Sequence, residues 1–226
     1  MMKNIILFGG GLHVQYCIDI IEKEDKYKII GITDSIKPIG TELYGYKIIG
    51  RQEQISELVE KHNILGGIIT IGDNWSRKYV HDFIVSKVPN FNFVNAIHPS
   101  TIIGNNVTIG VGNVIMAGVI INPGATVRNF CFFATGAQLE HDCFLDDYAS
   151  ISAGAVTGGK VTIGKFSAIT LGVTILDRIK IGENCLIGAG SLILKDVPDN
   201  VVVYGNPAKI IRTRKVGERF LKSEEE

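Results

Sequence analysis

The chain has 226 residues, and its 23 basic and 23 acidic side chains balance to a formal charge of zero. This length accommodates one large domain or two modest ones with buried cores. The even balance provides no field that would draw the protein to nucleic acid or to an anionic membrane. Four cysteines without paired spacing, the absence of a long apolar stretch and an N-terminus unlike a signal peptide predict a cytoplasmic protein without membrane insertion.

The first 95 residues alternate segments of strand-like and helix-like hydrophobicity. An apolar run at 5–8 ends at three glycines, and residues 13–24 place apolar side chains at helical spacing. Further strands are expected at 29–33, 67–71 and 91–94, with helices at 52–62 and from 72 to about 85. This alternation predicts an α/β domain over residues 1–95, built on a small Rossmann-like parallel sheet.

The loops that follow the first two strands carry the features of a nucleotide site. Gly9 and Gly11 form a G-x-G sequence after a strand, which suits the approach of a phosphate to a helix N-terminus. Val14 stands where a dinucleotide fingerprint has its third glycine, so the pattern argues against NAD. Asp34 ends the second strand at a position suited to a ribose contact. A nucleotide-sugar fits these features better than NAD does.

From about residue 97 the pattern changes to a repeat of six residues. Every sixth residue is apolar, with Thr157 as the exception, at Ile103, Ile109, Ile115, Ile121, Val127, Phe133, Leu139, Leu145, Ile151, Ile163, Ile169, Ile175, Ile181, Ile187 and Ile193. Small or medium side chains mostly follow four residues later. The repeat predicts a parallel β-helix over residues 96–206, in which three hexads form one coil and residues 18 apart stack.

The repeat ends near Pro198 and Pro207, because proline does not fit the interior of such a ladder. Residues 207–226 are expected to form a short C-terminal tail, with a basic helix over 207–222.

One polar group interrupts the apolar repeat, in the sequence LEHDC at 139–143. Leu139 and Cys143 fall on inward positions, so His141 is expected to face outward. A histidine can accept a proton near neutral pH, and a neighbouring carboxylate can fix its tautomer. Gly159 lies one coil further along and is expected to stack beside His141.

The two halves together resemble the NeuD/PglD-like sugar acetyltransferases, which are hexapeptide-repeat acyltransferases with a left-handed β-helix. The resemblance rests on GGGLHVQ (9–15), the acid Asp34, IGDNWSRK (71–78), HDC (141–143) and KDVPDNVVVYGNPAK (195–209), and it covers the chain from end to end. It implies a homotrimer with acetyl-CoA bound between adjacent subunits. It also implies transfer of the acetyl group to a sugar.

The resemblance further implies roles for individual residues. His141 is the general base, Asp142 is its orienting acid, and the N–H of Gly159 is a donor to the oxyanion. The positions that match acetyl-CoA contacts are Ser150, Gly159, Leu171 and Ala189. The positions that border the nucleotide-sugar are Gly11, His13, Asp34, Ser35, Gly72 and Asn74, with Arg77 as a candidate partner for phosphate. Trp75 is expected to cap the sheet rather than to stack on a base.

The expected reaction is N-acetylation, with acetyl-CoA as co-substrate and without a metal, of an amino group (at C4) on a nucleotide-linked amino-deoxysugar of bacterial surface glycans or glycoproteins. O-acetylation of sialic acid or a related sugar hydroxyl stays open, because a hydroxyl needs the same general base. A zinc enzyme of the γ-carbonic anhydrase type needs about three converging histidines, whereas the coil region has only His98 and His141. A non-catalytic trimeric nucleotide-binding module is the remaining alternative.

Overall fold

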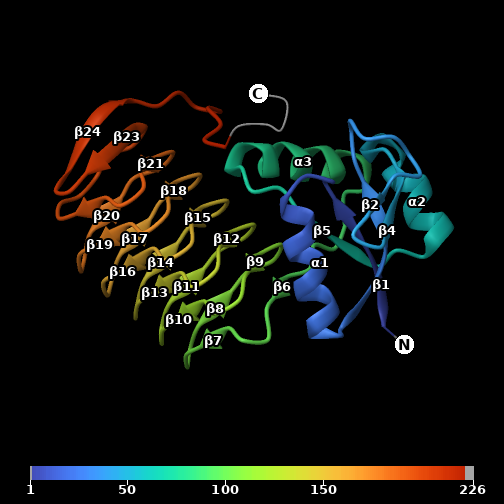
Figure 1. Cartoon of the computed structure of the whole chain (residues 1–226), viewed down its shortest axis with the longest axis horizontal. Helices are drawn as coiled ribbons and strands as arrows, with labels where there is room; N and C mark the ends of the chain where they lie inside the picture. Colours follow the sequence, from blue (N-terminus) through green and yellow to red (C-terminus); the bar gives the residue numbers. More distant parts are fainter. Residues whose placement is uncertain (1, 222–226) are drawn as a thin grey trace.

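The computed structural model describes residues 2–221, which form an α/β domain beside a left-handed parallel β-helix (Figure 1). The α/β domain contains a five-stranded sheet in the order β3-β4-β2-β1-β5, parallel except for the β3–β4 hairpin. Its strands are β1 (Lys3–Phe8), β2 (Tyr27–Thr33), β3 (Glu42–Leu43), β4 (Tyr46–Gly50) and β5 (Gly66–Ile69). The Rossmann-like parallel sheet that the sequence predicts is therefore confirmed.

Helices cover both faces of this sheet. α1 (His13–Glu24) packs on one face, and α2 (Ile55–His62), which follows the short 3-10 helix η1 (Gln52–Gln54), packs with α3 (Asn74–Lys87) on the other. The sequence predicts these helices closely but misses the β3–β4 hairpin. The strand expected at 91–94 is wrong, because Phe93 forms only an isolated bridge to Gly67.

The β-helix consists of two-residue strands joined by four-residue turns. These strands are β6 (Ala96–Ile97), β7 (Ile102–Ile103), β8 (Thr108–Ile109), β9 (Val114–Ile115), β10 (Ile120–Ile121), β11 (Thr126–Val127), β12 (Phe132–Phe133), β13 (Gln138–Leu139), β14 (Phe144–Leu145), β15 (Ser150–Ile151), β16 (Val156–Thr157), β17 (Thr162–Ile163), β18 (Ala168–Ile169), β19 (Thr174–Ile175), β20 (Lys180–Ile181), β21 (Leu186–Ile187) and β22 (Leu192–Ile193).

Three sheets form the three walls of the β-helix. We call them the domain-facing wall (β6, β9, β12, β15, β18 and β21), the β7 wall (β7, β10, β13, β16, β19 and β22) and the β8 wall (β8, β11, β14, β17 and β20). Pairing joins residues 18 apart, as Leu139 pairs with Ile121 one coil before it. The second residue of each strand and the small residue four positions later fill the interior, as the repeat predicts.

The α/β domain packs on one side of the β-helix only. Phe132, on the domain-facing wall, belongs to the same buried cluster as α1. Phe130 and Tyr148, in turns that lead from the β8 wall to the domain-facing wall, belong to the cluster of α3. We call this edge, which also carries Phe166 and Asn184, the aromatic corner. The edge between the β7 and β8 walls carries His141 and is called the histidine corner.

The chain continues in an antiparallel hairpin that extends the domain-facing wall, formed by β23 (Val201–Gly205) and β24 (Ala208–Thr213). The helix expected over 207–222 is therefore wrong within the described residues, and residue 222 lies outside them. The β-branched side chains Ile210, Ile211 and Thr213 suit a strand that pairs with the valines of β23. None of the helices between residues 2 and 221 combines the length and hydropathy that crossing a bilayer requires.

Candidate active site

The turn between β13 and β14 places His141 and Asp142 on the outside of the histidine corner. Nδ1 of His141 lies 3.0 Å from Oδ2 of Asp142, and each side chain is 55% exposed. The outward orientation of His141 and its pairing with Asp142 therefore match the sequence prediction. With Nδ1 held by the carboxylate, Nε2 is the ring nitrogen left to exchange a proton.

Gly159 lies directly beneath the ring of His141. A Cβ atom at this position would be 2.4 Å from Nε2 of His141, so only glycine leaves room for the ring where it lies. The stacking that the 18-residue spacing predicts is present. The N–H of Gly159, however, donates to Oδ1 of Asp177 at 2.7 Å. In this arrangement the N–H is engaged by an exposed carboxylate, and its role as an oxyanion donor stays a prediction.

Interior contacts hold the base of this turn. The hydroxyl of Thr157 accepts the N–H of Glu140 at 3.0 Å, and Sγ of Cys143 donates to the carbonyl of Gly158 at 3.2 Å. The Glu140 carboxylate accepts a hydrogen bond from Asn122 at 2.9 Å. Thr157 is the one polar residue among the every-sixth positions from Ile103 to Ile193, and that break in the repeat marks its contact with the histidine turn.

Asp34 joins the two predicted nucleotide loops of the α/β domain. Its Oδ2 accepts the N–H of Gly10 at 2.7 Å, and its Oδ1 accepts the N–H groups of Ile36 and Lys37, each at 2.8 Å. Partial burial raises the pKa of Asp34, but these N–H donors outweigh it, so the net pKa is lowered. The carboxylate is thus ionised and committed to shaping the loops, while Ser35 between them is exposed.

His13 lies where the glycine loop, the end of β5 and the β-helix meet. Gly11 lies two residues before His13 in the sequence. The ring of His13 packs closely on Gly72, where a Cβ atom would be 2.3 Å from Cε1 of His13. The imidazole ring is 5.2 Å from the ring of Phe132 on the domain-facing wall. Burial, and then the charge of Arg77, lower the pKa of His13, so the neutral form is favoured. Gly11, His13 and Gly72 are therefore brought together as expected.

Arg77 and Asn74 lie elsewhere than expected, because both are fully buried between α3 and the aromatic corner. The Arg77 guanidinium donates to the carbonyls of Phe130 at 2.9 Å and Tyr148 at 3.1 Å, and to Gly72 at 2.7 Å. Its remaining hydrogen bonds go to the carbonyl of Ile71 and the side-chain oxygen of Asn74. Burial lowers the pKa of Arg77 to about 10, which still leaves it charged at neutral pH.

These contacts correct two expectations. Arg77 has no surface from which to pair with phosphate, and Asn74 uses its amide to donate to the carbonyls of Phe166 and Ser167 rather than to border an open site. Trp75 does not cap the sheet. It stacks on Phe166 with ring centroids 4.0 Å apart and donates from Nε1 to Asn184 at 3.0 Å. All three residues attach α3 to the β-helix.

The expected acetyl-CoA positions do not converge within one chain. Ser150 is only 2% exposed on the domain-facing wall, and its hydroxyl has no partner among the described residues. Leu171 is 58% exposed and Ala189 is also exposed, in turns that lead from the domain-facing wall to the β7 wall. Gly159 lies at the histidine corner. The four positions are thus spread over one wall and two corners of the β-helix.

The two candidate regions also lie apart. The nucleotide loops belong to the domain that packs on the domain-facing wall, whereas His141 projects from the opposite corner, between the other two walls. Between residues 2 and 221, no three His, Cys, Asp or Glu side chains converge in an arrangement that would hold a metal ion.

Known proteins match both halves of the chain. The family model of the PglD N-terminal domain matches residues 4–84. PerB from Caulobacter crescentus, solved in complex with CoA and GDP-perosamine, superimposes with a TM-score of 0.86 and 26% identity, covering 94% of this chain and 99% of that one. The acetyltransferase domain of PglB from Neisseria gonorrhoeae FA1090 also gives a TM-score of 0.86 and 26% identity, covering 92% and 100%.

Curated relatives match over a shorter length. Serine acetyltransferase 2 from Arabidopsis thaliana is 38% identical over 117 residues, which are 51% of this chain and 32% of that protein. The serine acetyltransferase of Synechococcus elongatus is 33% identical over 107 residues, 43% of this chain and 44% of that protein. The chain thus spans about a third to a half of these relatives. The chain thus resembles the NeuD/PglD-like sugar acetyltransferases, in the match of residues 4–84 to the PglD N-terminal domain and in its end-to-end likeness to PerB and the PglB domain.

Proposed function

We propose that the protein transfers an acetyl group from acetyl-CoA to an amino group, at C4, of a nucleotide-linked amino-deoxysugar. The observation that carries the proposal is the exposed His141–Asp142 pair above Gly159. Two similar structures support it: the Caulobacter protein is a GDP-perosamine N-acetyltransferase in complex with CoA and GDP-perosamine, and the Neisseria domain was solved with acetyl coenzyme A. Such a reaction belongs in the cytoplasm of a bacterium that decorates its surface glycans or glycoproteins.

In the proposed reaction, Nε2 of His141 accepts a proton as the sugar amine attacks the thioester carbonyl. A C–N bond forms, the C–S bond of acetyl-CoA breaks, and the departing thiolate of CoA takes up the proton. Asp142 accepts the hydrogen bond from Nδ1–H and so keeps Nε2 free to act as the base. Such proton transfer typically contributes about 10²- to 10⁴-fold to a rate.

A homotrimer supplies the geometry that a single chain lacks. The nucleotide loops and His141 lie on different sides of one chain, so an acceptor held by the loops of one copy needs the histidine corner of another. The separation of Gly159 from Leu171 and Ala189 gives acetyl-CoA the same requirement. We propose that both substrates bind where the histidine corner of one copy meets the α/β side of its neighbour.

Thiol release from acetyl-CoA tests the proposal across UDP-, GDP- and dTDP-linked 4-amino sugars, with free and CMP-activated sialic acid as competitors. We expect release with one amino-sugar nucleotide, and a loss of about 10²-fold or more in His141→Ala, while assembly and nucleotide binding persist. Acetylation of sialic acid alone would replace the proposal with O-acetylation. If acetyl-CoA is never consumed while nucleotide still binds, the chain is a non-catalytic trimeric module.

A further inference from the structure

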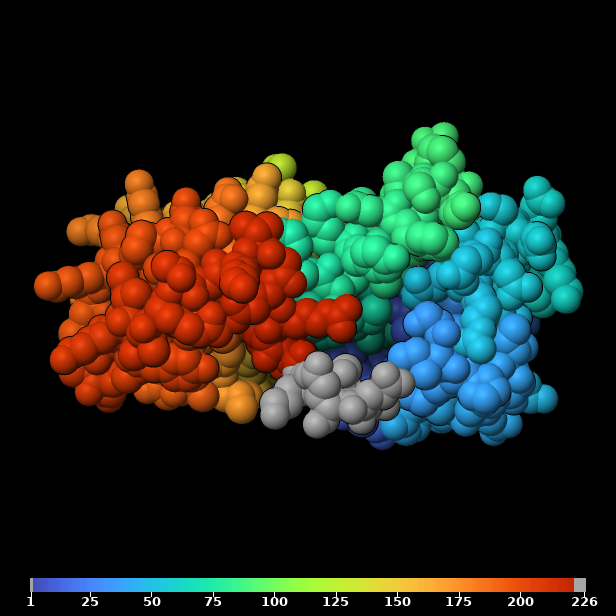
Figure 2. Space-filling view, turned by 90° about the horizontal axis from the view of Figure 1, so that it is seen from above, coloured from blue at the N-terminus to red at the C-terminus, as the bar shows by residue number. Residues whose placement is uncertain are grey.

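The last described residues return from the β-helix to the α/β domain. After β24, residues 214–221 run back along the molecule to the N-terminal end of α3 (Figure 1). In the view from above, the C-terminal residues, drawn in red, reach the green surface of α3 (Figure 2). We call residues 214–221 the C-terminal strap.

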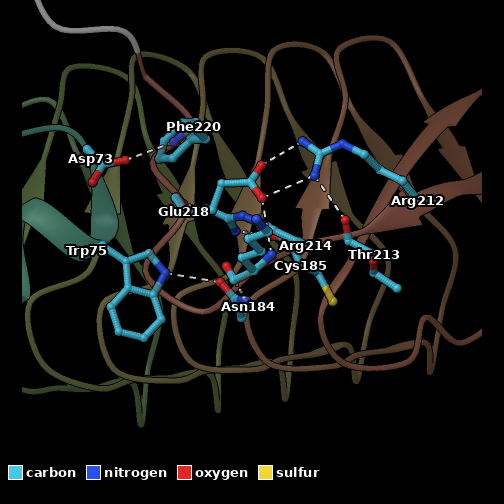
Figure 3. Close-up of polar contacts among 10 residues, drawn as sticks. Asp73, Trp75, Asn184, Cys185, Arg212, Thr213, Arg214, Glu218 and Phe220 are labelled. Carbon is cyan, nitrogen blue, oxygen red and sulfur yellow. Dashed lines mark hydrogen bonds and ion pairs between the residues drawn. The ribbon is translucent and has the colours of Figure 1, made fainter.

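Arg214 anchors the start of the strap in the β-helix (Figure 3). It is 3% exposed, and Nη1 donates to the carbonyls of Cys185 at 3.1 Å and Phe166 at 3.4 Å. Its Nη2 donates to the carbonyl of Glu218 at 2.7 Å. One buried guanidinium therefore binds the strap to two turns of the aromatic corner and to the strap's own later residues.

The Glu218 side chain closes the strap into a compact loop. Its carboxylate accepts hydrogen bonds from both terminal nitrogens of Arg212, at 2.6 and 3.1 Å, and from the N–H of Lys215 at 3.1 Å. The hydrogen bonds from Arg212 and Lys215 lower the pKa of Glu218 to about 2. The Glu218 carboxylate thus holds the later part of the strap against Arg212 of β24 and against Lys215 at the start of the strap. Its removal is expected to loosen the strap where it folds back toward β24.

Asp73 receives the far end of the strap. The N–H of Phe220 donates to Oδ2 of Asp73 at 3.0 Å, while Oδ1 of the same carboxylate accepts the N–H of Ser76 and caps α3. Asp73 is itself buried and directly follows Gly72, the residue against which His13 packs. The strap is therefore connected, through one carboxylate, to the edge of the candidate nucleotide site.

Asn184 makes a second connection between the strap and α3. Its Oδ1 accepts from Nε1 of Trp75 at 3.0 Å, and its Nδ2 donates to the carbonyl of Lys215 at 3.2 Å (Figure 3). The side chain is almost fully buried, so both contacts are shielded from water. The beginning of α3 thus contacts the β-helix and the strap at the same point.

We infer that the C-terminal strap positions the acceptor site: it fixes Asp73, and with it the Gly72–His13 contact, against the β-helix. Glu218 and Asp73 are positioning residues that need not touch a substrate. The inference rests on the proposed function for its assignment of the acceptor as a nucleotide-sugar. None of the strap's hydrogen-bond partners in the rest of the described chain is a position expected to contact acetyl-CoA; these partners are Asp73, Phe166, Asn184, Cys185, Asn200 and Arg212. Loosening the strap is therefore expected to weaken acceptor binding and to spare acetyl-CoA binding.

The test compares truncation after Val216 and Glu218→Ala with the wild-type chain. We expect the KM for the nucleotide-sugar to rise roughly three- to tenfold, with kcat and the KM for acetyl-CoA within about twofold. Glu218→Gln keeps acceptor oxygen for Arg212 and Lys215, so it is expected to recover most of the loss. Arg219→Ala is the matched control, because Arg219 lies in the same segment, is exposed and makes no hydrogen bond or ion pair with any of residues 2–221.

Amide hydrogen exchange at 72–77 gives a readout that does not depend on activity. Exchange is expected to quicken roughly tenfold in the truncated chain and to stay unchanged in Arg219→Ala. Unchanged exchange after truncation, or a parallel rise in the KM for acetyl-CoA, overturns the inference. If the wild-type chain transfers no acetyl group, the proposed function fails separately. In that case, calorimetric nucleotide binding decides the inference, which stands if truncation weakens binding and falls if it does not.

Discussion

The histidine corner and the aromatic corner use the same four-residue turn for opposite purposes. The third residue of each turn has a left-handed backbone, with φ of +55° at Phe130 and +59° at Tyr148 on one corner, and +56° at Asp142 and +59° at Lys160 on the other. This conformation is unusual for a bulky side chain and is imposed here by the coil. The backbone is therefore equivalent at both corners, and side chains alone decide whether a corner binds a domain or stays open.

The aromatic corner shows what the coil spacing makes possible. The rings of Phe130 and Tyr148 stack 5.2 Å apart at 9°, and those of Tyr148 and Phe166 stack 5.2 Å apart at 13°. Trp75 from α3 adds a fourth ring on Phe166. These separations suit aromatic stacking, which adds about 0.5–1.5 kcal/mol per pair beyond burial. The histidine corner has no such column and leaves His141 and Asp142 accessible to solvent and substrates.

The strongest test of this contrast is Arg77→Met, which removes the buried guanidinium between α3 and the aromatic corner. The carbonyls of Phe130 and Tyr148 would lose their charged donor, so we expect a loss of about 3 kcal/mol or more in the free energy of unfolding. Chemical denaturation measures it. Arg128→Met is the control, because Arg128 is half exposed and forms only a long ion pair, with Nε 3.9 Å from Oδ1 of Asp147. This substitution should lower the free energy of unfolding by less than about 0.5 kcal/mol. Equal losses would show that the buried Arg77 guanidinium stabilises the aromatic corner no more than an exposed arginine does.

Gly159→Ala is the corresponding test at the histidine corner. The new methyl group would overlap the His141 ring, so the ring must move, and we expect kcat to fall about 10- to 100-fold. Stability should change little, because the backbone of Gly159 does not have a positive φ. Steady-state kinetics and thermal unfolding separate these effects. In the His141→Ala background the same substitution should cause no further loss of rate, and an additional loss would assign Gly159 a role of its own.

Trp75→Phe is expected to have a smaller effect. The substitution keeps an aromatic ring on Phe166 but removes the hydrogen bond from Nε1 to Asn184, at a cost of about 1 kcal/mol in unfolding free energy. Trp75→Ala, which also removes the stack, should cost more. A result in which both variants match the wild-type chain would mean that the aromatic column does not hold α3.

The smallest expected effect concerns pH. The pKa of His13 is lowered in the folded chain, so below its ordinary value of about 6.5 the unfolded chain binds the proton more readily. Stability contributed by neutral His13 is therefore present above that pH and is lost as pH falls below it. Denaturation at pH 7.5 and 5.5 should show a larger decline for the wild-type chain than for His13→Gln. Identical declines would mean that His13 titrates normally.

The repeat made the β-helix predictable because each coil imposes the same spacing. The inward positions, the exposure of His141 and its stacking on Gly159 all follow from counting in sixes and eighteens. Asp177, which accepts the hydrogen bond from the N–H of Gly159, lies another 18 residues along the chain, so the same spacing places it beside Gly159.

The roles of Arg77, Asn74 and Trp75 were not predictable in the same way. Their motif marks a helix start, but their partners on the β-helix are carbonyls, a ring and an amide 53 to 109 residues away in sequence. Local pattern identifies the helix and says nothing of the surface that it meets. The C-terminal hairpin was missed for the same reason, because pairing with β23 outweighs the weak local preference of a short basic segment.

The C-terminal strap has a consequence for how this fold can vary over evolution. Hexapeptide coils can in principle be duplicated, since each new coil pairs with its neighbours as the old one did, and each adds about 4.8 Å to the length. A strap of fixed length must still reach from β24 to Asp73. It therefore acts as a molecular ruler, and we expect coil number and strap length to change together among proteins that retain this contact.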